Sequence, residues 1–134
     1  MVAESILRID LASPEPAYEQ IVNGLRGLLV SGGFQPGEQL PPVRQLALDL
    51  SLNHNTVAEA YRLLAKEGWL DLRQGRGAIV LARQSPKPSR ASRSQWVRRL
   101  RELTNEAIAN GLAKAEIAGE LELLATAVRK GGGT

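Results

Sequence analysis

Three amphipathic helices are predicted in the first half of the chain from apolar residues spaced three or four positions apart. They span about 16–31, 43–50 and 54–67. Pro16 suits the first turn of a helix, where its missing N–H has no partner, and Gly32-Gly33 end the first helix. The Pro-Gly and Pro-Pro pairs within 34–42 indicate a connector before the second helix.

Two short strands are expected directly after the third helix. Apolar runs at 69–73 and 78–81 flank Gln74-Gly75-Arg76-Gly77, and a glycine-containing link of this length is typical of a β-hairpin. Helical spacing then recurs from Trp96 to Gly111 and from Ile117 to the closing glycines. We therefore expect a mainly α fold with a small β-hairpin.

The second and third helices have the spacing of a helix-turn-helix. A helix of about eight residues, a break at 51–53 and a helix of about fourteen residues would hold the third helix out toward the major groove of DNA. Many helical proteins contain such a pair, so the spacing alone is weak evidence. The adjoining hairpin strengthens it, because two strands placed there describe a wing that can reach a neighbouring groove.

A change in composition divides the chain. Residues 84–94 are rich in Ser, Pro, Lys and Arg and carry no apolar side chain larger than Ala91. We expect residues 1–83 to form a winged helix-turn-helix DNA-binding domain, residues 84–94 a basic flexible linker, and residues 95–134 a helical dimerisation region. The linker can attract phosphates in a sequence-independent way or can simply be solvated.

The positive charge is modest and unevenly distributed. The net charge is +3, and the sequence pI is about 9.7. Residues 1–84 hold 8 basic and 9 acidic side chains, whereas residues 85–134 hold 9 basic and 5 acidic ones. A DNA-binding surface in the first part must therefore come from a few arginines gathered on one face.

Composition also argues against several kinds of site and location. The chain has no cysteine, so it has no disulfide, thiolate nucleophile or Cys-ligated metal. His54 is the only histidine, and we expect no metal site and no cofactor. The first residues lack the basic start and long apolar run of a secretion signal, and no apolar stretch approaches membrane-spanning length. We therefore expect a cytoplasmic protein with no membrane partner.

Several blocks of the sequence resemble the GntR family of bacterial repressors. The blocks occur in the family's order within a stretch of about 65 of the 134 residues, and they are Pro16 to Ile21, Pro36 to Ala47, Asn55 to Arg62, and Gly75-Arg76-Gly77. The two-helix tail is similar to that of the YtrA subfamily. The resemblance implies a repressor that binds double-stranded DNA at an inverted-repeat operator as a homodimer. In this subfamily it often implies control of a transporter operon.

Five candidate DNA contacts lie in and before the third helix. Arg44 can place a planar guanidinium on a phosphate or a guanine edge, and the resemblance implies DNA contact by the matching arginine. Its alternative role is a surface arginine that pairs locally. Asn53, His54, Asn55 and Thr56 are short polar residues at the front of the helix, where they can bond base edges or phosphates. Either asparagine can instead cap the helix.

Four more candidates lie farther along the chain. Arg62 is predicted near the exposed face of the third helix, where it either meets a phosphate or is solvated. In the hairpin, Gly75 lets the main chain approach DNA closely, and Arg76 suits the minor groove or its phosphates. Gln74 can add a polar contact. A tight turn would require glycine here with or without DNA.

Three residues depart from the family pattern. Pro42 replaces a capping serine before the second helix, and Ser51 replaces a glycine in the turn, so Ser51 must adopt a geometry that glycine adopts more easily. Ala58 replaces a larger residue and removes one possible base contact. The operator sequence therefore cannot be taken from relatives.

The two tail helices would expose an apolar stripe if they stood alone. We expect a second copy of the chain to cover it, which would set two third helices about one DNA turn or more apart. The alternative is that the tail packs on its own winged domain. The sequence does not identify an effector, and a small molecule would have its most suitable place at the dimer seam.

The alternative classes of function are an enzyme and a protein-binding module. The chain has no phosphate-binding glycine loop and no evident cluster of paired carboxylates, so we do not expect an enzyme. Some relatives carry a large aminotransferase-like domain after a similar winged domain, but about 50 residues after the wing cannot form that fold. In the second alternative, the winged fold is kept and the third helix binds protein instead of DNA.

Overall fold

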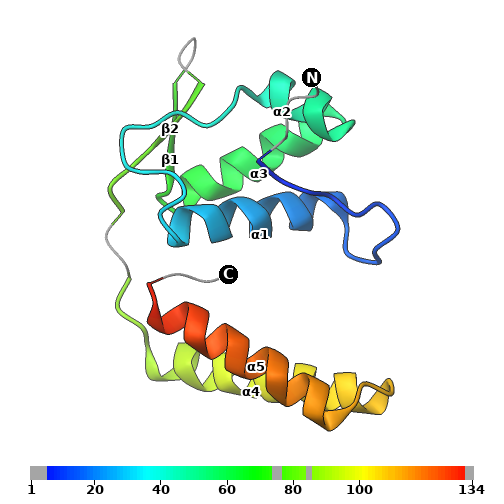
Figure 1. Cartoon of the computed structure of the whole chain (residues 1–134). Coiled ribbons are helices and arrows are strands. Elements are labelled where there is room, and N and C mark those ends of the chain that lie inside the picture. Colours follow the sequence, from blue (N-terminus) through cyan, green and yellow to red (C-terminus); the bar gives the residue numbers. More distant parts are fainter. Residues whose placement is uncertain (1–5, 74–76, 84–85, 132–134) are drawn as a thin grey trace. The chain divides into compact units, whose positions relative to one another are not determined.

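A computed structural model describes residues 6–73, 77–83 and 86–131 (Figure 1). The chain divides into a first unit, residues 1–83, and a second unit, residues 84–134. The first unit contains α1 (Ala17–Val30), α2 (Val43–Leu50), α3 (His54–Lys66), β1 (Leu70–Arg73) and β2 (Gly77–Val80), and the second contains α4 (Arg90–Ala109) and α5 (Lys114–Arg129). The predicted fold class, mainly α with a small β-hairpin, is confirmed.

Proline residues precede the starts of α1 and α2, and a residue with left-handed backbone angles ends α2. Pro16 and Pro42 directly precede the two helices, where a residue without an N–H leaves no bond unmade, and neither supplies a side-chain cap. The α2 helix ends at Ser51, whose φ of 57° lies in the left-handed region that favours glycine. The geometry expected of Ser51 is therefore present.

The core of the first unit lies where α1 and α2 pack against α3. The buried side chains of α3 recur every three or four residues, as the sequence predicts; they are Val57, Ala60, Tyr61 and Leu64. Tyr18 and Trp69 are half-buried and pack at the edge of this core.

Tyr61 also joins α3 to the segment that leads into α2. Its hydroxyl donates a hydrogen bond of 2.6 Å to the carbonyl oxygen of Pro41. Burial raises the pKa of Tyr61 above its usual range. The helix-turn-helix is thus held from within by a buried phenol as well as by apolar contact.

The hairpin has a third segment of main chain beside it. Strands β1 and β2 pair antiparallel, with Leu70 opposite Val80 and Arg73 opposite Gly77. On the other edge of β2, the connector expected between the first two helices contributes backbone hydrogen bonds at Gly37, Glu38 and Leu40. The prolines and glycine of this connector predict irregular chain, so the pairing with a distant strand was not anticipated.

In the second unit, α4 begins earlier than expected. It starts at Arg90, so the last five residues of the predicted linker, 90–94, belong to the helix, and the prediction of a linker extending to residue 94 was wrong. The cause is local: Ser89 caps the helix by accepting a bond from the Ser92 N–H at 3.0 Å, directly after Pro88. Within the described residues, no helix is long and apolar enough to span a membrane.

Candidate nucleic-acid interface

The front of α3 presents polar side chains to the surface. Asn53 caps the helix, because its Oδ1 accepts a bond of 2.8 Å from the Asn55 N–H. Asn53, His54 and Asn55 are exposed, and Thr56 is half-buried. None of the four lies in the core, so all have side-chain atoms available to a ligand.

A first groove runs between α2 and the front of α3. It has a volume of about 490 Å³ and is lined by Arg44, Ala47, Leu48, Leu52, Asn53 and His54. The fold thus brings Arg44 to the same hollow as two of the polar residues of α3. Within the described part of the chain, no acidic side chain lines this hollow, which makes it suitable for an anion.

A second groove runs between α3 and the hairpin. It has a volume of about 300 Å³ and is lined by Val43, Ala58, Tyr61, Arg62, Leu72, Arg73, Gly77 and Ala78. The small side chain of Ala58 helps to leave this space open. Two arginines from different elements, Arg62 on α3 and Arg73 on β1, therefore line a single hollow, and none of its described lining residues is acidic.

The three hairpin candidates Gln74, Gly75 and Arg76 lie outside the described residues. Their flanking residues are placed, since Arg73 pairs with Gly77 at the end of the hairpin. Because both flanking residues line the second groove, Arg73 and Gly77 lie beside Ala58 and Arg62 of α3.

Two residues of these grooves were not singled out from the sequence. Leu48 is exposed in the first groove although it is apolar. Its position in the sequence could have indicated this exposure, because it lies off the helix face that carries the buried Leu46 and Ala47. Arg73 ends a predicted strand, and no sequence pattern reveals that this strand faces Arg62. Only the fold brings the two arginines to one groove.

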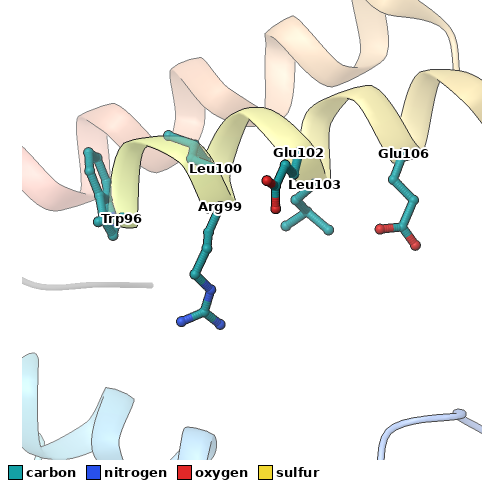
Figure 2. Close-up of a pocket in the computed structure, with 6 residues that line it drawn as sticks. All are labelled: Trp96, Arg99, Leu100, Glu102, Leu103 and Glu106. Carbon is teal, nitrogen blue, oxygen red and sulfur yellow. The ribbon is translucent and has the colours of Figure 1, made fainter. Parts of the chain in front are cut away.

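The second unit presents a separate apolar surface on α4. A shallow hollow of about 500 Å³ is lined by Trp96, Arg99, Leu100, Glu102, Leu103 and Glu106 (Figure 2). Trp96 is 65% exposed and Leu103 is 64% exposed, so this apolar surface is largely uncovered. Figure 2 shows Arg99 and Glu106 projecting from the same side of the helix, with Leu103 between them.

Metal binding finds no support in the part of the chain that the structure describes. No three side chains of His, Asp, Glu or Cys gather there as a metal ion would require.

Comparison with known proteins identifies the family. The sequence pattern that defines the gntR family of bacterial regulatory proteins matches residues 17–80 of this chain. The solved structure of YtrA from Sulfolobus acidocaldarius, a GntR-family transcription factor, is 32% identical, covers 92% of this chain and 99% of that one, and superposes with a TM-score of 0.52. This chain belongs to the GntR family. The GntR-type winged helix-turn-helix expected from the sequence is confirmed, and so is the YtrA-like resemblance.

Other similarities have different extents. The HTH-type transcriptional repressor YtrA of Bacillus subtilis (strain 168) is 40% identical to this GntR chain over 75 residues, which are 56% of this chain and 58% of that protein. A structure described as a transcriptional antiterminator from Listeria monocytogenes EGD-e is 25% identical, covers 90% of both chains and has a TM-score of 0.69. The chain thus spans less than two thirds of the length of the Bacillus protein.

Proposed function

We propose that this GntR-family chain is a sequence-specific transcription repressor that binds an inverted-repeat operator as a homodimer. It is not an enzyme in this proposal. The name of the similar Bacillus protein, a transcriptional repressor, supports the direction of regulation. The YtrA-like resemblance makes transporter operons the first genes to test as targets.

One observation carries the proposal. The exposed front of α3 lies between two hollows whose described lining contains arginine and no acidic side chain, with Arg44 in the first groove and Arg62 and Arg73 in the second. A helix in the major groove needs short polar groups at its front to bond base edges and cations on both sides to bond the flanking phosphates. The composition of the first unit is slightly acidic overall, yet its arginines gather where this arrangement needs them.

The test begins with selection and sequencing of genomic fragments that the protein retains. A symmetric sequence shared by the retained fragments is the expected result. Arg44→Ala and Arg76→Ala should each weaken binding to that sequence about tenfold or more, because each removes a charge-assisted contact. Unchanged affinity in both variants, with unchanged circular dichroism, would count against the assigned surface.

The absence of DNA binding at any salt concentration would favour the alternative in which α3 binds protein. A salt titration separates the two alternatives, because phosphate contacts make affinity for DNA fall steeply as salt rises.

The homodimer is proposed through the surface of α4. Neither α4 nor α5 has a buried residue among those described, so the pair lacks a core of its own. A second copy of the chain would cover Trp96 and Leu103. The charges are also self-complementary: in an antiparallel pair of α4 helices, Arg99 of each copy would lie opposite Glu106 of the other.

Leu103→Glu tests this surface. It should shift the protein toward monomer in sedimentation analysis and weaken operator binding, because it places a charge in the centre of the apolar contact. Leu11→Glu is the matched control, since Leu11 is an exposed leucine of the first unit. Dimers that persist in Leu103→Glu would contradict the proposed surface, and a monomeric unmodified protein would favour a tail packed on its own domain.

A further inference from the structure

Strand β1 places Asp71 and Arg73 on the same side of the hairpin, because residues two apart along a strand share a face. The Arg73 Nε donates to Oδ2 of Asp71 at 2.6 Å. The pair is not buried, since the Arg73 side chain is 60% exposed and the Asp71 side chain 31% exposed. The carboxylate therefore restrains a guanidinium that solvent and ligands can still reach.

The restraint uses only one nitrogen of Arg73. Among the described residues, the two terminal nitrogens of Arg73 make no hydrogen bond. These two nitrogens are free to form the paired contact that a guanidinium makes with a phosphate. Arg73 also lines the second groove, whose lining includes Arg62 and excludes Asp71.

DNA geometry shows what would lie in this groove. If α3 occupies the major groove and the hairpin end reaches the adjacent minor groove, one sugar-phosphate strand must pass between them, since that strand separates the two grooves. The second groove is the space between α3 and the hairpin. We propose that it holds a backbone phosphate between Arg62 and Arg73, and that Asp71 is a positioning residue that orients Arg73. This inference rests on the proposed DNA-binding function.

For the change in DNA affinity when Asp71 is neutralised, the positioning role and charge repulsion alone predict opposite signs. An acidic side chain near DNA repels phosphates, so its neutralisation should strengthen binding if charge alone matters. If Asp71 orients Arg73, its neutralisation should weaken binding, because the guanidinium then loses its fixed direction and must be ordered when DNA binds. The direction of the change therefore separates the two explanations.

The experiment measures binding of a fluorescein-labelled mixed-sequence DNA duplex at several salt concentrations, because a phosphate contact does not require the operator. Asp71→Asn should weaken binding about threefold or more, and Asp71→Glu should recover part of the loss. Arg73→Gln should weaken binding and lower the slope of log affinity against log salt by about one. Thermal melting of each variant checks that the fold is kept.

Glu59→Gln is the matched control. Glu59 is exposed on α3 and makes no ion pair within the described residues, so its neutralisation should strengthen binding or leave it unchanged. Stronger binding by Asp71→Asn would overturn the positioning role, and an unchanged salt slope in Arg73→Gln would overturn the phosphate contact. Failure of the unmodified protein to bind any duplex would instead refute the proposed function, and this inference with it.

Discussion

Ser51 holds a backbone conformation that costs an L-amino acid about 1–2 kcal/mol. Its φ of 57° ends α2 and turns the chain toward the front of α3. The conformation is kept because the turn also satisfies main-chain groups of α2, including the carbonyl oxygen of Ala47, which accepts a bond from the Leu52 N–H at 2.9 Å. The backbone strain at Ser51 is thus offset by the hydrogen bonds of the turn that joins α2 to α3.

Ser51→Gly should raise the free energy of unfolding by about 0.5–1 kcal/mol, because relief of the left-handed strain exceeds the added entropy of the unfolded chain. Urea denaturation measures the change. Ser31→Gly is the control: Ser31 is also exposed at a helix end, but its φ is −79°, so glycine there should destabilise the protein. Stabilisation by both variants, or by neither, would contradict this account of Ser51.

Tyr61 makes the free energy of unfolding depend on pH in the alkaline range. Its pKa is raised by burial, so the unfolded phenol ionises near pH 10 while the folded one stays neutral. The unfolded state then binds fewer protons, and stability should fall above about pH 10 by up to about 1.4 kcal/mol per pH unit. The stability is fully present below that pH.

Tyr61→Phe should lower stability by about 1 kcal/mol at neutral pH, because the Pro41 carbonyl loses its partner. The variant should also lose part of the alkaline slope in denaturant titrations from about pH 9 to 11. An identical slope in the variant and the unmodified protein would show that another group causes it.

At the scale of elements, hydrophobic spacing predicted the three helices of the first unit to within one residue at each end. It succeeded because one face of each helix is buried against the same core, which makes the period visible. The bonds from Gly37 and Leu40 to β2 were not predictable, since nothing in the order of residues links a proline-rich connector to a strand about 40 positions later. The start of α4 was missed because charged residues show no apolar period.

The ion pair between Arg26 and Glu67 connects α1 to the end of α3. The Arg26 Nη2 lies 2.7 Å from a Glu67 carboxylate oxygen, and the Arg26 Nε bonds the other oxygen at 3.3 Å. Glu67→Gln should cost about 0.5 kcal/mol in low salt and less in high salt, because the pair is partly exposed. Glu102→Gln is the control, since its pair with Arg98 is looser, at 4.0 Å, and more exposed. Equal losses in both variants would contradict the prediction.

At the scale of the whole molecule, the two units differ in how much each can stabilise itself. The first unit has a continuous apolar core, whereas α4 and α5 bury no described residue. The sequence indicated the cluster at the front of α3, because helix-turn-helix spacing marks that position. It did not indicate Arg73, because that residue lines its groove only when the hairpin folds beside α3.

A mixture of two charge-reversed variants tests the proposed pairing of whole chains. In Arg99→Glu alone or Glu106→Arg alone, like charges would face each other across the dimer, whereas a mixed dimer would restore attraction at both places. Native mass spectrometry of the mixture should therefore show heterodimers above the random share. A random distribution would exclude the antiparallel arrangement of α4.

The main-chain bonds between Gly37–Leu40 and β2 also affect how readily the hairpin can pair with another molecule. An open strand edge offers unpaired N–H and carbonyl groups on which another molecule can add a strand, and aggregates grow from such edges. Here the outer edge of β2 is already occupied by the chain's own connector, and the β1 strand carries the charged side chains of Asp71 and Arg73. The hairpin can therefore project from the protein without acting as a template for sheet growth.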